Sequence, residues 1–210
     1  SSNVLEYLGV KFSNDENHLK KCLDQSNICY LHAPIFHPSM KNVAPIRKDL
    51  GFKTFFNLLG PLVNPSSPKN QITGVYNLEI ARLYGYIFKN TNKNFSIVYS
   101  LDGYDEISLT GSFKLINNFS EIISDCNYFK LQKTMAKDIL GGKSIEDSAN
   151  IFKNILSGKG TNNQVNVVLA NSSLAIQTIT NKDIDECIEI AKESIESGKA
   201  YSSLKKLIEA

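Results

Sequence analysis

No run of 18 apolar residues occurs in these 210 residues, so the sequence offers no helix that could span a membrane. The first twenty residues also lack the charged, apolar and small-residue regions of a secretory signal, and we expect none. With 42% hydrophobic residues and a mean hydropathy of −0.18, the composition is typical of a globular protein. We therefore expect a soluble, cytoplasmic protein whose chain is long enough to bury one sizeable core.

An excess of either charge is missing too. Lys and Arg together number 23 against 21 Asp and Glu, a net charge of +2. Nucleic-acid-binding proteins usually concentrate basic residues on one face, so this balance argues against a nucleic-acid partner. The four cysteines form no CxxC pair, which indicates reduced thiols and argues against structural zinc. They are Cys22, Cys29, Cys126 and Cys187.

The common local signatures of catalysis are absent as well. We find no Ser-His-Asp or Cys-His arrangement, no P-loop and no GxGxxG pattern. Internal repeats, low-complexity tracts and long linkers are also missing, which favours a single domain over residues 1–210. The sequence thus identifies no residue as a general acid or base.

What the sequence does contain is an alternation of helical and strand patterns. Residues 77–90 repeat apolar side chains at helical spacing, and 95–101 is a short apolar run typical of a buried parallel strand. The helical set is Ile80, Tyr84, Ile87 and Phe88. The run 165–170 has strand propensity, although its helical flanks could override it. This alternation predicts an α/β fold with a mostly parallel central sheet flanked by helices.

One stretch departs from the alternation, because residues 33–70 hold all six prolines of the chain. Proline fixes φ and breaks helices, so we expect short helices joined by rigid corners there. Rigid corners suit a segment that presents side chains to a ligand.

Two adjacent acids, Asp105 and Glu106, follow the predicted strand in a glycine-flanked loop that also holds Asp102. In open α/β sheets, ligands bind in the crevice beyond the carboxyl ends of the strands. Carboxylates at that place could hold Mg²⁺, which usually takes one or two protein carboxylates together with phosphate and water. A solvated acidic turn is the alternative, and the residues alone leave both interpretations open.

The proline-rich stretch holds further candidates. Arg47 could bind a carboxylate through two parallel hydrogen bonds, or it could pair with a nearby acid at the surface. Gly60 before Pro61 could let the backbone approach a flat ligand closely, or form only a tight turn. His37 could be a core histidine, a helix cap or part of a site wall.

Taken together, these blocks resemble the anthranilate phosphoribosyltransferases. The resemblance is carried by FHPSMKNVAPIRKDLGFKTFFNLLGPLVNP (36–65), by GVY and DGYDEISLTG after it, and by LGGKSIEDSANIFKNILSGKG and AKESIESGKAYSSLKKL towards the end. It implies transfer of phosphoribosyl from phosphoribosyl pyrophosphate to the amine of anthranilate, with release of pyrophosphate, in tryptophan biosynthesis. It also implies an α/β catalytic domain like that of nucleoside phosphorylases, a small helical domain with which about 34–65 packs, and a homodimer.

The resemblance gives each candidate residue a role. Arg47 would contact the anthranilate carboxylate, Gly60 and Pro61 would line the aromatic pocket, and we count His37 with them. The adjacent acids Asp105 and Glu106 would bind Mg²⁺ near the pyrophosphate.

Two features depart from the family pattern. The glycine-rich phosphate loop (Gly-Thr-Gly-Gly-Asp) and a Lys-His-Gly-Asn segment, which lie further upstream in the family, do not occur here. We therefore expect the domain to be incomplete at its N-terminus, or this chain alone to be inactive. Residues 171–177 carry polar side chains where the resemblance leads us to expect mostly Ala, which we interpret as a packing variation.

Three alternatives to the enzyme follow from the same residues. Pyrimidine nucleoside phosphorylases share the scaffold but should not need Arg47 or the wall at Gly60. A nucleic-acid-binding paralogue would need clustered basic residues. A non-catalytic module could keep the fold without the phosphate loop.

Overall fold

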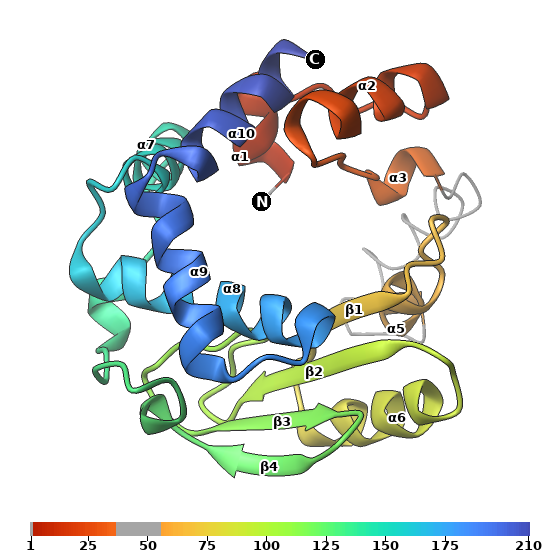
Figure 1. Cartoon of the computed structure of the whole chain (residues 1–210), viewed down its shortest axis with the longest axis vertical. Helices are drawn as coiled ribbons and strands as arrows, with labels where there is room; N and C mark the ends of the chain where they lie inside the picture. Colours follow the sequence, from red (N-terminus) through yellow and green to blue (C-terminus); the bar gives the residue numbers. More distant parts are fainter. Residues whose placement is uncertain (1, 37–55) are drawn as a thin grey trace. The chain divides into compact units, whose positions relative to one another are not determined.

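The structure, a computed structural model, describes residues 2–36 and 56–210, which divide into two units by their internal contacts. The first, the helical unit, takes residues 1–67, 142–150 and 199–210. The second, the sheet unit, takes residues 68–141 and 151–198. Figure 1 labels the helices and strands of both units.

The helical unit contains helices and turns in its described residues. They are α1 (Ser2–Tyr7), α2 (Glu16–Ser26), α3 (Ala33–Phe36), α5 (Phe56–Leu59), the 3₁₀ turn η1 (Gly60–Leu62), the start of α7 (Ile145–Leu156) and α10 (Lys199–Glu209). Its core joins the two ends of the chain, because Val10 and Cys22 are buried with Leu207. The side chain of Lys21 adds a hydrogen bond of 2.7 Å to the carbonyl oxygen of Ala210.

The sheet unit is built on four strands that lie side by side in sequence order. They are β1 (Asn70–Gly74), β2 (Asn94–Ser100), β3 (Phe113–Asn117) and β4 (Glu121–Ser124). Strands β1 and β2 are parallel and are joined by α6 (Leu78–Lys89), whereas the pairs β2–β3 and β3–β4 are antiparallel.

The α/β class with flanking helices is therefore confirmed, but the expectation of a mostly parallel sheet is corrected for the described part of the chain. One of its three strand pairings is parallel. The connections explain the difference. A parallel neighbour needs a crossover such as α6, and the helix-free links that follow β2 and β3 return the chain antiparallel instead.

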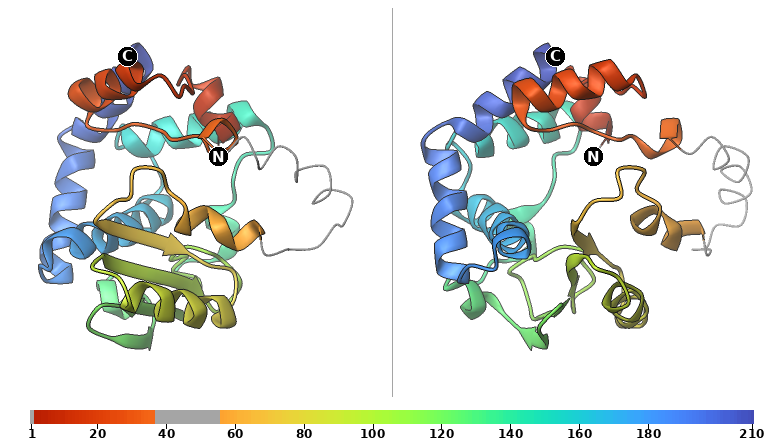
Figure 2. Two further views of the ribbon diagram at one scale, coloured as in Figure 1. Left: turned by 90° about the vertical axis from the view of Figure 1, so that its right-hand side faces the viewer. Right: turned by 45° about the vertical axis from the view of Figure 1, so that its right-hand side comes forward.

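Helix α6 covers one face of the sheet (Figure 2). It begins at Asn77, whose side-chain oxygen accepts a hydrogen bond of 2.8 Å from the amide of Ile80. The predicted apolar stripe is buried at Ile80, Tyr84 and Phe88, while Ile87 remains 37% exposed. The ring of Phe88 lies 5.5 Å from that of Phe95 on β2, so this stripe packs directly on the sheet.

Helix α8 (Asn162–Thr180) covers the opposite face and begins with a capping box between Thr161 and Gln164. The hydroxyl of Thr178 lies 2.7 Å from that of Ser96 on β2, and the neighbouring Val98 belongs to the same apolar core as Leu174. Strand β2 is thus covered on both faces, which explains its continuous apolar pattern. The run 165–170, ambiguous in the sequence, is helical.

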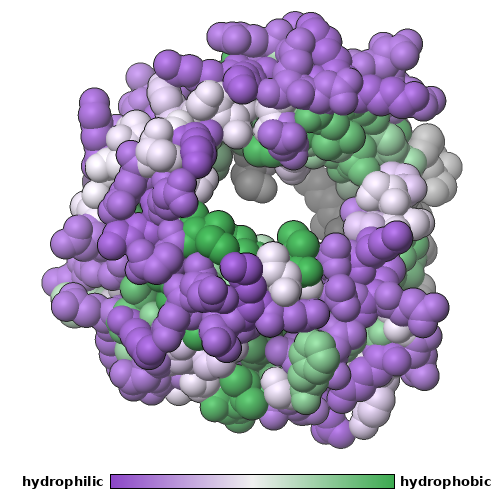
Figure 3. All heavy atoms as spheres, in the orientation of Figure 1, coloured by the Kyte–Doolittle hydropathy of each residue, from purple (hydrophilic) through white to green (hydrophobic). Residues whose placement is uncertain are grey.

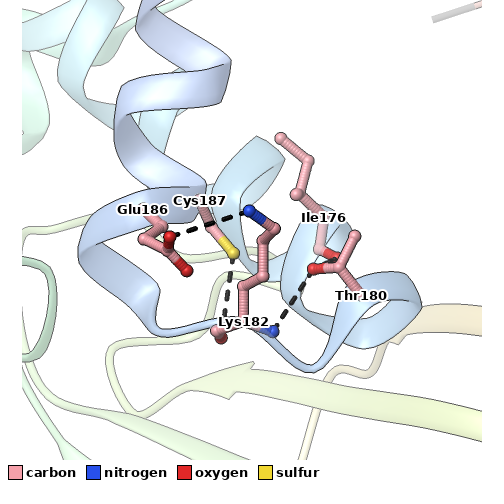
Figure 4. A network of polar contacts seen from close by, with 5 residues as sticks. All are labelled: Ile176, Thr180, Lys182, Glu186 and Cys187. Atoms are coloured by element: carbon pink, nitrogen blue, oxygen red, sulfur yellow. Dashed lines mark hydrogen bonds and ion pairs between the residues drawn. The ribbon is translucent and has the colours of Figure 1, made fainter.

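A short corner joins α8 to α9 (Ile184–Glu196), and Figure 4 shows its polar contacts. The amide of Lys182 donates to the hydroxyl of Thr180 at 3.4 Å, and that hydroxyl donates to the carbonyl oxygen of Ile176 at 2.9 Å. The ammonium group of Lys182 lies 3.7 Å from the carboxylate of Glu186. Burial raises the pKa of the Cys187 thiol, whose sulfur lies 3.9 Å from the Lys182 carbonyl oxygen. The Cys187 side chain is fully buried and so contributes to the packing of α9.

The remaining elements of the sheet unit are the 3₁₀ turns η2 (Cys126–Phe129) and η3 (Ala136–Ile139) and the end of α7. All four cysteines of the chain are free of disulfides. None of the helices in residues 2–36 and 56–210 combines the length and apolar character of a membrane span. The face drawn in Figure 3 is mostly hydrophilic.

Candidate metal and substrate site

The chain turns sharply after β2, and this turn carries the two adjacent acids. We call residues 101–106 the acid turn. The amide of Gly103 donates to the carbonyl oxygen of Ser100 at 2.9 Å, and the amide of Ser100 donates to that of Tyr104 at 2.9 Å. Gly103 has φ +103°, a conformation that glycine adopts at little cost. The turn leaves Asp105 and Glu106 exposed just beyond the carboxyl end of β2.

The two acids line a pocket of about 340 Å³ within the sheet unit. Its other lining residues are Ile72 and Gly74 of β1, Val98 of β2 and Asn171 of α8. Because β1 and β2 are parallel, their carboxyl ends meet at the same edge of the sheet, which is where the sequence led us to expect a ligand. The volume lies in the range of small-molecule sites.

The acid turn rests directly on the backbone of β1. A Cβ atom added to Gly74 would lie 1.8 Å from the carbonyl oxygen of Asp105, a distance that no two such atoms can share. Glycine is therefore required at position 74. On the β2 side, the hydroxyl of Ser100 donates a hydrogen bond of 2.6 Å to the carbonyl oxygen of Glu106.

Helix α8 holds the residue that follows the acids. The side-chain oxygen of Asn171 accepts a hydrogen bond of 2.9 Å from the amide of Ile107, and its nitrogen donates one of 2.8 Å to the Ile107 carbonyl oxygen. The same nitrogen donates to the carbonyl oxygen of Val167 at 2.8 Å. The interpretation of residues 171–177 as a packing variation is therefore corrected for Asn171, which sequence reasoning missed as a site residue.

The third acid of the loop has a different place. A carboxylate oxygen of Asp102 accepts a hydrogen bond from the hydroxyl of Thr110, which lies 2.7 Å from the hydroxyl of Ser108. Ser108 is buried and its hydroxyl lies 3.4 Å from that of Ser100. Asp102 therefore braces the loop, and Asp105 and Glu106 are the acids that line the pocket.

The chemistry of the acid pair fits Mg²⁺. Residues 2–36 and 56–210 contain no group of three or more His, Cys, Asp or Glu side chains that could hold a metal ion by themselves. Mg²⁺ does not need such a cage, because it commonly binds one or two carboxylates and completes its shell with substrate phosphate and water. Asp105 and Glu106 supply this donor set beside an open pocket.

The other predicted residues belong to the helical unit. Gly60 and Pro61 form the η1 turn, where Gly60 is exposed and Pro61 half-buried. A Cβ atom on Gly60 would meet nothing described within 4 Å, so its backbone has an open face. His37 and Arg47 lie outside the described residues, and their roles stay predictions.

The sheet unit is thus an α/β domain with a carboxylate pair and a pocket at the carboxyl end of its parallel strand pair, which is the place where α/β domains usually bind ligands. Comparison with known families makes this class specific. Residues 1–201 match the family model described as "Glycosyl transferase family, a/b domain", and the chain belongs to that family.

Relatives and solved structures carry a common name. An anthranilate phosphoribosyltransferase of Christiangramia forsetii is 58% identical over 207 residues, which are 99% of this chain and 62% of that protein. The structure of the Saccharomyces cerevisiae anthranilate phosphoribosyltransferase in complex with PRPP and Mg is similar with a TM-score of 0.90 and 30% identity, over 99% of this chain and 60% of that one. The same yeast enzyme in complex with 4-fluoroanthranilate gives a TM-score of 0.89 and 28% identity, over 99% and 61%. This chain thus spans about three fifths of the length of these proteins.

Proposed function

We propose that this chain belongs to an anthranilate phosphoribosyltransferase, a Mg-dependent pentosyltransferase of tryptophan biosynthesis. The enzyme would transfer phosphoribosyl from phosphoribosyl pyrophosphate to the amine of anthranilate and release pyrophosphate. The 58% identity to a protein of that name supports the proposal, as does the similarity to yeast structures whose names include PRPP, Mg and an anthranilate analogue.

The observation that carries the proposal is the fixed acid turn. Asp105 and Glu106 line the pocket while the backbone around them is held by Gly74, Ser100 and Asn171. These carboxylates would hold Mg²⁺, which when bound neutralises negative charge on a diphosphate. Because the turn is held in advance, little reorganisation would be needed as charge grows on the leaving group.

In the reaction, the bond from the anomeric carbon to the pyrophosphate oxygen breaks, a bond to the anthranilate nitrogen forms, and the nitrogen loses a proton. Arg47 would bind the anthranilate carboxylate and so aim the amine at the anomeric carbon. Gly60 and Pro61 would form a flat wall for the aromatic ring, and His37 would stand beside it. These four roles rest on the resemblance of the sequence.

Three further properties complete the proposal. We infer a homodimer in the cytoplasm, with about 34–65 packed in a small helical domain, from the family resemblance. Light scattering of the natural full-length protein tests the dimer, and a monomer at micromolar concentration contradicts it.

The function is tested by an enzyme assay that compares the natural full-length protein with a variant that lacks the carboxylates of Asp105 and Glu106. Anthranilate fluorescence should fall only when phosphoribosyl pyrophosphate and Mg²⁺ are both present. The double substitution Asp105→Ala and Glu106→Ala should reduce this turnover at least about 100-fold, since it removes both carboxylate ligands of the proposed metal. If the unaltered protein consumes no anthranilate under these conditions, the proposed function is wrong.

A further inference from the structure

Asn171 stands out among the residues of the pocket because its side chain is fully engaged by backbone groups. Its two amide hydrogens donate to the carbonyl oxygens of Ile107 and Val167, and its oxygen accepts from the amide of Ile107. A carboxamide has two donor hydrogens, and both have partners here. Asn171 therefore has no hydrogen left for a substrate, although it lines the pocket.

The pairing with Ile107 is of a particular kind. One side chain contacts both the N–H and the C=O of a single residue, which is how a neighbouring strand would bind it. Ile107 is fully buried and directly follows Glu106. Without hydrogen-bond partners, the buried N–H and C=O groups of Ile107 would destabilise the fold, since a buried unpaired peptide group costs free energy.

The acid turn needs such an anchor because two adjacent carboxylates repel each other. Strand β1 limits the turn on one side through Gly74, and Ser100 of β2 holds the carbonyl oxygen of Glu106. Asn171 adds a contact from α8, 64 residues away in the sequence. The two carboxylates are thereby tied to a long helix as well as to the sheet.

We propose that Asn171 is a positioning residue for the metal-binding pair. By holding the backbone of Ile107, it fixes the direction in which Asp105 and Glu106 present their carboxylates. This inference rests on the proposed function, in which those carboxylates hold Mg²⁺.

The test compares two kinds of substitution in α8 of the natural full-length protein. Asn171→Leu keeps the branched shape of the side chain and removes all three hydrogen bonds, and Asn171→Ala provides a second variant if Leu is too large. The matched control is Thr178→Val, which also keeps its shape. This control variant removes the hydrogen bonds of the Thr178 hydroxyl to Ser96 and to the Leu174 carbonyl oxygen, and neither contact involves the acid turn.

Three readouts separate positioning from general stability. Hydrogen exchange measures the protection of the Ile107 amide. Electron paramagnetic resonance measures the Mn²⁺ dissociation constant in the presence of pyrophosphate, and steady-state kinetics give the Mg²⁺ concentration for half-maximal turnover. We expect the Asn171 variants to lose protection at Ile107 and to weaken both metal constants about 10- to 100-fold, as partners of metal ligands do. Thr178→Val should lower the melting temperature and leave the metal constants unchanged.

The outcomes distinguish this inference from the proposed function. If the Asn171 variants shift the metal constants no more than Thr178→Val does, the positioning role is refuted. The double variant at Asp105 and Glu106 supplies the second comparison. If it binds Mn²⁺ as the unaltered protein does, the metal role of Asp105 and Glu106 is refuted, whereas the proposed function itself is refuted only if the unaltered protein consumes no anthranilate. If the double variant binds Mn²⁺ weakly and Asn171→Leu binds it normally, only the positioning role of Asn171 is refuted.

Discussion

Replacing Gly74 by Ala should move the acid turn without touching a carboxylate. The new Cβ atom would lie 1.8 Å from the Asp105 carbonyl oxygen, whereas ordinary contacts of a Cβ atom lie at 3.4–4 Å. The turn or the end of β1 must therefore shift by about 1.6 Å, the difference between 1.8 Å and the shortest ordinary contact of 3.4 Å. Since the contacting atom is backbone, no side-chain rotation can relieve the overlap.

Two magnitudes follow from this shift. Overpacking of this kind typically costs about 1–3 kcal/mol of stability, so the protein should remain folded. A misplacement of about 1 Å in a positioned group can reduce turnover about 100-fold. We therefore expect Gly74→Ala to lose far more activity than stability, together with a higher Mg²⁺ requirement.

Gly85→Ala is the matched control in the same unit. Its added Cβ atom would lie 3.3 Å from the side chain of Ile116 on the α6 face of the sheet, so a few tenths of an ångström of adjustment suffice. Thermal unfolding and Mg²⁺-dependent turnover of the full-length variants are measured in parallel. If Gly74→Ala and Gly85→Ala show the same turnover, the position of the acid turn does not govern the reaction.

Two further predictions concern charge. Arg47→Ala should raise the KM for anthranilate about 10- to 100-fold with a smaller change in kcat, because a lost bidentate contact to a carboxylate is worth about 1.5–3 kcal/mol. Steady-state kinetics measure both constants, and an unchanged KM contradicts the proposed contact. Lys114, at 2.8 Å, holds the pKa of Glu121 below its ordinary value of 4.5. A lowered pKa means that the pair stabilises the fold above pH 4.5 and loses this effect as the pH falls through the lowered value. Lys114→Met should therefore be less stable than the unaltered protein at neutral pH, by at most about 1 kcal/mol because the Glu121 side chain is 44% exposed, and the difference should vanish in acid. Denaturant unfolding at several pH values measures it, and a constant difference contradicts the pairing.

The parts of the fold that sequence could predict are those set by local pattern. The strand expected over 95–101 is β2 (Asn94–Ser100), and the helix expected over 77–90 is α6 (Leu78–Lys89). Both have strong periodicity or strong caps, which act over a few residues. The run 165–170 was ambiguous because its β-branched residues favour a strand, and the capping box at Thr161 together with packing on the sheet decides for the helix.

The candidate site was predictable in part for the same reason. The short loop that carries Asp105 and Glu106 comes directly after β2, so their place at a strand end could be predicted from neighbouring residues. Asn171 could not be found in this way, since its partner Ile107 lies 64 residues away and a polar residue in a helix gives no sign of its partner. The signal available in the sequence was the polar residue itself, directly after the apolar run 167–170.

The mixed direction of the sheet bears on how the site works. Because β3 returns antiparallel to β2, the acids lie in a loop whose two ends are held together by the pairing of these strands. At the base of this loop, the amide of Leu101 donates to the carbonyl oxygen of Ser112 at 2.8 Å. A parallel continuation would have required a longer crossover, usually with a helix, and the acids would have stood at the start of a long excursion. The closed connection instead confines them to the edge where β1 and β2 end together. The antiparallel return that sequence patterns failed to predict is thus part of what holds the two carboxylates at the pocket.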